Sequence, residues 1–152
     1  MNTKTLKGIG VAISLLVGIG AASPVLAKAT SARKLGAATN AIDVWTFTCP
    51  ADFPIGQARV YDLAATANAP AQMQVVSGKK GHPSVQVTDT DPPSDGEGGG
   101  PSVMATLDGG EGIYVVAFKK TAPGVEGYIG EMFCRDENRA IHNPTIDLQI
   151  DQ

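Results

Sequence analysis

The stretch that decides the fold is Asp43-Val44-Trp45-Thr46-Phe47-Thr48-Cys49, which is closed by Pro50. Its side chains alternate between two faces. Trp45, Phe47 and Cys49 share one face, and the β-branched residues between them share the other. Aromatic and β-branched residues at a period of two are typical of a strand with one face in a core. The pattern begins at Ile42, so residues 42–49 predict the first strand of the folded domain.

Further segments of this kind follow at short intervals, separated by Gly, Pro, Asn and Asp. They are residues 57–63, 71–77, 84–88, 102–107, 112–119, 127–134 and 145–150. A helix over residues 62–71 is the main alternative, because alanine is frequent there, but Pro70 and the lack of an apolar stripe argue against it. Seven to eight short strands predict an all-β fold, an antiparallel β-sandwich with jelly-roll or Greek-key-like connections.

The N-terminal segment predicts export. Lys4 and Lys7 precede a largely apolar run over residues 9–22, and small residues lead up to Ala27. This layout is typical of a secretory signal peptide over residues 1–27, and the run is shorter than the roughly 20 residues that span a bilayer. We therefore expect a secreted or periplasmic bacterial protein with no membrane span after cleavage. Residues 28–41 are small and polar and predict a flexible arm, and residues 42–152 predict a single β-sandwich domain.

The two cysteines, Cys49 and Cys134, predict a disulfide, because an even number of cysteines in an exported chain is usually oxidised. A metal pair or a reactive thiol is disfavoured, since there is no CxxC and neither cysteine has a nearby histidine. The bond would close a loop of more than half the chain and stabilise the fold by roughly 4–5 kcal/mol. It also requires the first and penultimate predicted strands to lie side by side.

The composition excludes some classes of function. Apolar residues make up 43% of the chain and charged residues 18%, which is unlike a disordered chain. The formal net charge is −3 and becomes −5 when Lys4 and Lys7 are removed with the signal peptide. A mildly acidic protein is poorly suited to bind nucleic acid or anionic lipid through bulk electrostatics.

Three motifs resemble those of the bacterial pre-peptidase C-terminal domain, a small secreted β-sandwich often appended to exported proteases. The segment 43–47 resembles its opening Asp-x-aromatic-x-Phe strand, residues 107–116 (LDGGEGIYVV) its Leu-x-x-Gly-x-Tyr-x-Val turn and strand, and residues 127–129 (GYI) its closing Gly-x-Tyr. The family's paired-Asp segment has no counterpart in residues 71–77, which carry no acid. The resemblance implies the sandwich fold rather than a particular activity.

One acidic segment is a candidate calcium site. Asp89, Asp91, Asp95 and Glu97 fall within nine residues that also contain glycine and proline. Clustered carboxylates on tight turns supply the oxygen ligands that Ca²⁺ requires, although Pro93 interrupts the EF-hand registers that start at Asp89 and Asp91. The alternative is a solvated loop whose charge discourages edge-to-edge association. Both interpretations stay open, and no other cofactor is expected.

The remaining polar motifs favour structural roles. His82 and His142 each lie in a predicted turn, with no matched third ligand for zinc, and no Gly-x-Ser-x-Gly motif is present. Residues 78–81 (GKKG) predict a hairpin turn with exposed lysines, and Lys119 and Lys120 predict a strand end that faces solvent.

These observations favour a non-catalytic exported module over an enzyme. We expect it to bind a protein or glycan partner of the cell envelope or extracellular space, through loops or an exposed strand edge. One alternative is a small secreted hydrolase that uses carboxylates of residues 89–97, with or without calcium. The other is a structural surface protein that self-assembles by strand addition.

Overall fold

The computed structural model describes residues 28–63, 72–89 and 100–152, and these form strands and turns with no helix. The strands are β1 (Lys28–Ala29), β2 (Arg33–Leu35), β3 (Ile42–Cys49), β4 (Ile55–Asp62), β5 (Met73–Lys79), β6 (His82–Thr88), β7 (Ala105–Asp108), β8 (Gly112–Lys120), β9 (Glu126–Arg135), β10 (Ile141–His142) and β11 (Ile146–Ile150). The predicted all-β fold is confirmed.

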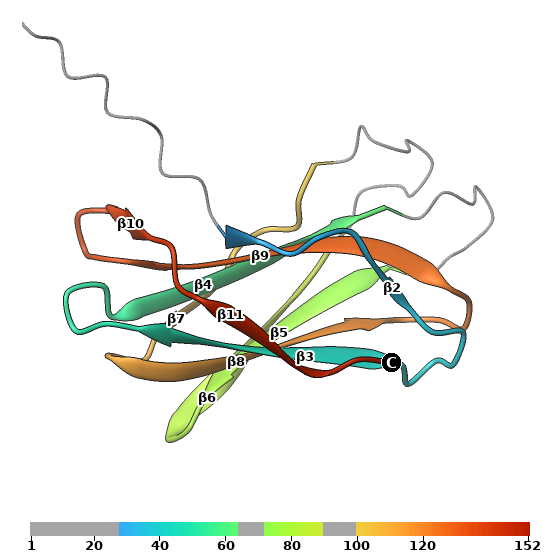
Figure 1. Ribbon diagram of the computed structural model, residues 1–152, viewed down its shortest axis with the longest axis horizontal. Helices are drawn as coiled ribbons and strands as arrows, with labels where there is room; N and C mark the ends of the chain where they lie inside the picture. The colour runs from blue at the N-terminus through green and yellow to red at the C-terminus, as the bar shows by residue number, and fades with distance from the viewer. Residues whose placement is uncertain (1–27, 64–71, 90–99) are drawn as a thin grey trace, which may run out of the picture.

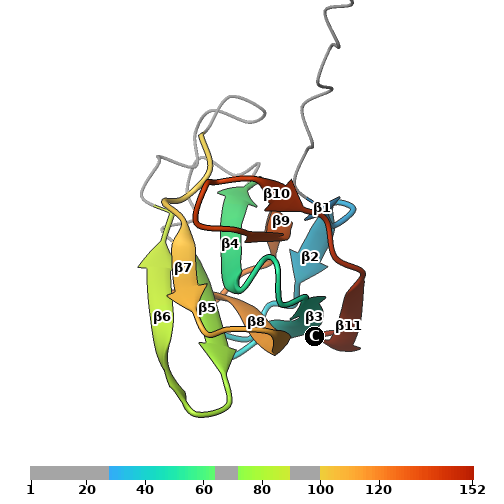
Figure 2. The same cartoon turned by 90° about the vertical axis from the view of Figure 1, so that its left-hand side faces the viewer.

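The strands form two antiparallel sheets that pack face to face (Figure 1). The first, here sheet A, has the order β1-β9-β4-β7, and β2 and β10 also pair with β9. The second, here sheet B, has the order β11-β3-β8-β5-β6. Figure 2 shows the two layers from one end, with β4 and β9 above β3 and β8. The predicted β-sandwich is therefore confirmed.

Each of the eight predicted strands corresponds to one strand of the structure, with boundaries shifted by a few residues. The largest difference at a start is in β7, which begins at Ala105 rather than at Ser102. The segment considered as a helix, residues 62–71, begins within β4, and its residues 64–71 lie outside the described residues.

The chain crosses between the sheets at most of its turns. β3 belongs to sheet B, β4 to sheet A, β5 and β6 to sheet B, β7 to sheet A, β8 to sheet B and β9 to sheet A. As a result β3 pairs with β8, and β4 pairs with β9. This non-sequential pairing is the behaviour expected of Greek-key-like connections.

Residues 28–41, which we expected to be a flexible arm, contain β1 and β2, and both pair with β9. The backbone N–H of Thr30 donates to the carbonyl oxygen of Gly130 at 2.8 Å. Leu35 has none of its surface exposed. The segment joins the fold because β9 offers unpaired backbone groups along that edge, and Leu35 gains burial in the core.

The core contains a stacked and a tilted aromatic pair, each lying against a glycine. Phe47 stacks on Tyr114 with ring centroids 5.3 Å apart. A Cβ added at Gly56 would lie 2.5 Å from the Tyr114 ring, so β4 can approach that ring because residue 56 has no side chain. Phe118 and Tyr128 form the second pair, at 4.9 Å, beside Gly130. The glycines thus allow aromatic side chains of β8 to fill the space between the sheets.

The predicted disulfide between Cys49 and Cys134 is present, with a Cα–Cα distance of 5.5 Å. Cys49 ends β3 in sheet B, and Cys134 lies near the end of β9 in sheet A. The bond therefore joins the two layers covalently across the core.

Candidate binding surface

Asp89 is the one member of the predicted calcium site that falls within the described residues. It is buried, and its carboxylate accepts a hydrogen bond from the backbone N–H of Asp62 at 3.2 Å. Asp91, Asp95 and Glu97 lie outside the described residues. Within residues 28–63, 72–89 and 100–152, no group of three or more His, Cys, Asp and Glu side chains could hold a metal ion. The calcium site stays a prediction.

The two histidines lie in separate strands. His82 is exposed at the start of β6 in sheet B, whereas His142 lies in β10 of sheet A, with its ring 5.4 Å from the ring of Phe53. Both were predicted to lie in turns, but His82 begins β6 and His142 ends β10.

A buried polar network joins the opening strand to β9 and to the C-terminal residues. The Tyr128 hydroxyl donates to Asp43 at 2.6 Å and accepts from the Trp45 indole N–H at 3.2 Å. The backbone N–H of Gln152 donates to the other oxygen of Asp43 at 2.9 Å, and the Arg33 Nε lies 3.7 Å from the oxygen that accepts from Tyr128. Burial, followed by the hydrogen bond to Asp43, raises the pKa of Tyr128 far above its ordinary value. Because Asp43 and Tyr128 are fully buried, we assign this network to stability rather than to chemistry.

The lysine predictions were partly wrong. Lys120 is buried rather than solvent-facing, and its ammonium donates to the carbonyl oxygens of Gly36 and Gly124. Lys79 is half-buried, because its ammonium binds the carbonyl oxygens of Gly109 and Gly110 at 2.6 and 2.9 Å. Each lysine satisfies backbone carbonyls of a glycine-containing turn, which the local sequence around the lysine does not reveal.

Glu126, at the start of β9 and near Lys120, is a further buried ionisable residue. It is fully buried, and within residues 28–63, 72–89 and 100–152 neither carboxylate oxygen has a hydrogen-bond partner. Burial and the neighbouring charge of Asp62 raise its pKa, and Lys120 opposes this shift. Burial of this carboxyl group without a hydrogen bond is therefore unfavourable for the folded state.

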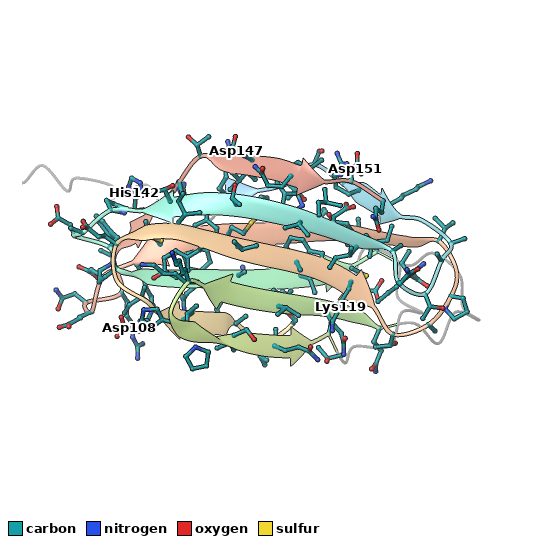
Figure 3. The ribbon with its side chains drawn as sticks, turned by 90° about the horizontal axis from the view of Figure 1, so that it is seen from below. Asp108, Lys119, His142, Asp147 and Asp151 are labelled. Atoms are coloured by element: carbon teal, nitrogen blue, oxygen red, sulfur yellow. A yellow bond between two sulfur atoms is a disulfide. The ribbon has the colours of Figure 1, made fainter. Side chains whose placement is uncertain are left out.

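The most distinctive open surface is the outer face of sheet B, which Figure 3 shows from the front. Directly paired residues of neighbouring strands point to the same side of a sheet, so the register defines this face. Its rows are Thr48 and Ile113; Asp147, Thr46, Val115 and Gly78; Ile150, Val44, Ala117, Val76 and Gln86; and Ile42, Lys119, Gln74 and Thr88. We call these residues the sheet B face.

The sheet B face is almost free of ionisable side chains. Among its residues, Asp147 and Lys119 alone are ionisable, and Figure 3 shows both near the border of the face. Val115, in an inner row, is 42% exposed, and Ile113, in the row at one end of the face, is 62% exposed. Gln74 donates to Thr88 at 3.1 Å, so part of its polar surface is already hydrogen-bonded. The face is therefore broad and rich in β-branched side chains, and little hydration free energy is lost when a partner removes water from it.

We expected binding through loops or a strand edge and missed this face, although the sequence contained a signal for it. In residues 112–118 (GIYVVAF) both alternating faces are apolar, since Ile113, Val115 and Ala117 match Tyr114, Val116 and Phe118. An outer strand face that contacts only solvent is usually polar.

Comparison with known proteins found no matching family model, no matching curated protein and no matching solved structure. The resemblance to the pre-peptidase C-terminal domain therefore stays a prediction. Among the residues that the structure describes, no helix is long and apolar enough to cross a membrane.

Proposed function

We propose that this protein is an exported, non-catalytic β-sandwich module that binds another protein of the cell envelope or extracellular space through the sheet B face. The signal-peptide pattern supports export, and the disulfide is consistent with an oxidising compartment.

The observation that carries the proposal is the absence of charge across the centre of the sheet B face. In a protein with 27 charged residues, charge reaches this face at Lys119 and Asp147. The fully buried centre of a protein interface is depleted of charged residues, because charges lose their hydration when a partner covers them. Exposed Ile113 and Val115 would gain burial instead.

A protein partner fits this face better than a glycan. Sugar rings are commonly held by stacking on aromatic side chains, but the aromatic residues of β3 and β8 point into the core. The sheet B face offers Val, Ile, Thr and Gln instead. These side chains suit a flat, uncharged protein surface, for which we expect contact by shape and burial.

Substitution of Val115 by lysine tests the proposal. The mature protein is immobilised, exposed to an extract of the native envelope, and any bound protein is then purified and its affinity measured directly. Val115→Lys places a charge at the centre of the face, whereas Val103→Lys places one at another exposed valine, in the segment before β7. We expect Val115→Lys to weaken binding by about tenfold or more and Val103→Lys to leave it unchanged.

Two results would overturn the proposal. One is equal affinity of the wild type and Val115→Lys for the purified partner, with both proteins folded by circular dichroism. The other is a robust catalytic turnover that a single substitution of an acid or histidine abolishes. Size-exclusion chromatography across concentrations identifies the case in which the partner is a second copy of the chain.

A further inference from the structure

A hollow of about 440 Å³ lies on the other side of the sandwich, on the outer face of sheet A. Its lining comes from β4, β9, β10, the segment before β7 and the turn before β10. The lining residues are Gln57, Met104, Phe133, Arg135, Arg139 and Ile141. The volume falls within the range of sites for small molecules, which are about 300–1,000 Å³.

The lining of the hollow is mostly apolar and contains one fixed amide. Gln57 and Phe133 are paired across β4 and β9, and both are buried. The Gln57 side chain donates to the Thr106 hydroxyl at 2.7 Å, which holds the amide in place. Met104 and Ile141 add aliphatic surface. The site therefore offers burial to an apolar group and one oriented polar side chain.

Two arginines line the same hollow, and neither has a carboxylate partner in the part of the chain that the structure describes. The other described arginines form ion pairs: Arg33 with Asp151 at 2.5 Å, and Arg59 with Glu131 at 2.5 Å. Within residues 28–63, 72–89 and 100–152, neither Arg135 nor Arg139 lies within 4.0 Å of an acid. The chain has more acidic than basic residues, so a shortage of carboxylates does not explain why these two arginines form no ion pair among the described residues.

Arg135 has a donor that the protein does not use. Its Nε is buried and has no hydrogen-bond partner among the described residues. A buried donor without an acceptor is unfavourable, and such a group in a folded protein calls for an explanation. Because this Nε lies beneath the surface, a bound anion would supply the acceptor only after the Arg135 side chain turns toward the hollow.

Arg139 is held in an unfavourable backbone conformation. Its φ of 70° lies in the left-handed region, which glycine and asparagine adopt far more readily than arginine. The turn is fixed by a hydrogen bond from Arg139 N–H to the Asp136 carbonyl at 3.2 Å and by one from Ala140 N–H to the Asp136 carboxylate at 2.7 Å. Strained residues are enriched at ligand sites, so an arginine at this position points to a role for its side chain.

We propose that this hollow binds a small organic carboxylate, with Arg135 and Arg139 holding the carboxylate and the apolar lining holding its hydrocarbon part. The planar guanidinium matches a carboxylate through two parallel hydrogen bonds. Met104, Phe133 and Ile141 favour a ligand with one charged end rather than a fully ionic group such as free phosphate. The site lies on the opposite sheet from the proposed protein-binding face, so the two proposals stand independently.

Titration of the mature protein with hexanoate, followed by NMR, tests the site. We expect saturable shifts of the backbone amides in residues 133–141. Hexanol keeps the hydrocarbon and lacks the carboxylate, and inorganic phosphate keeps the charge and lacks the hydrocarbon. Both are expected to bind at least about tenfold more weakly than hexanoate, because each loses one half of the interaction.

Three variants separate binding from folding. Arg139→Gln and Arg139→Gly are each expected to weaken hexanoate binding about tenfold, while Arg139→Gly raises the melting temperature by relieving the backbone strain. Lys80→Gln removes a positive charge from the exposed β5–β6 turn and is expected to bind as the wild type does. The proposal is overturned if hexanoate produces no saturable shifts, if hexanol binds equally well, or if the Arg139 variants keep full affinity.

Discussion

Removal of the disulfide is expected to cost this protein a large part of its stability. Cys49 and Cys134 are separated by 85 positions and join the two sheets. In the chain-entropy model, a loop of this length stabilises the folded state by about 4.6 kcal/mol at 25 °C. Domains of this size unfold with about 5–15 kcal/mol, so the double variant Cys49→Ala, Cys134→Ala is expected to stay folded with a narrow margin.

Urea unfolding followed by tryptophan fluorescence measures this loss. Trp45 is the single tryptophan, is nearly buried and lies in the same strand as Cys49, so its emission reports on the core. With a slope of about 2 kcal/mol per molar urea, the midpoint is expected to fall by about 2 M. Wild-type protein reduced by dithiothreitol is the matched control, because it loses the bond and keeps both sulfur atoms.

A midpoint shift below about 0.5 M in both samples would refute the reasoning. It would mean that unfolded chains with and without the bond differ little in conformational freedom. Two free thiols in the mature wild-type protein, detected by intact mass, would contradict the disulfide itself.

Three further predictions concern the core and the acidic segment. Gly56→Ala places a Cβ 2.5 Å from the Tyr114 ring, so urea unfolding should show a loss of about 1–3 kcal/mol in the free energy of unfolding. Gly78→Ala is the control, because its Cβ would lie 3.9 Å from the nearest atom, and it should lose less than about 1 kcal/mol. Equal losses in the two variants would contradict the packing argument. Burial raises the pKa of Glu126, so the contribution of this residue to wild-type stability should fall as pH rises above about 4.5. Glu126→Gln should flatten that pH dependence and have a higher melting temperature than the wild type at pH 7. Parallel pH profiles of the two proteins would contradict this prediction. EDTA separates the two interpretations of residues 89–97: a solvated loop predicts an unchanged melting temperature, whereas a calcium site predicts a fall that Ca²⁺ restores.

The Tyr114 ring has little freedom to move away from a new methyl group. Its hydroxyl accepts a hydrogen bond from the backbone N–H of Gly109 at 3.1 Å and lies 2.6 Å from the carbonyl oxygen of Pro54. Phe47 stacks on its face. These contacts are the reason that overpacking at Gly56 is expected to be costly.

The strands could be predicted because alternation is a local property of the chain. Residues 42–49 and 112–119 show it clearly, and both segments form strands of sheet B. The short strands β1 and β2 could not be predicted, because small polar residues carry no periodic signal and become ordered only by pairing with β9. The burial of Lys120 could not be predicted for a similar reason, because one of the two carbonyl groups that it binds belongs to Gly36, which is distant in the sequence.

The candidate sites depended even more on tertiary structure. The sheet B face combines β3, β8 and β5, and the hollow combines β4, β9 and β10 with a turn and the segment before β7. No local pattern reports that Arg135 and Arg139 share a cavity, or that a glutamine on another strand completes it. The acidic residues 89–97 could be identified as a candidate site from the sequence, because their charges are clustered along the chain itself.

By itself, the sequence determined the strand-rich class, the pairing of its two cysteines and the pattern typical of export. These properties follow from the residue types and their spacing, which do not depend on distant parts of the chain. The tertiary structure alone decided the order of strands in each sheet, which aromatic ring meets which glycine, and which surfaces stay uncovered. Such choices depend on contacts between residues far apart in the chain, where packing and hydrogen bonding outweigh local preference.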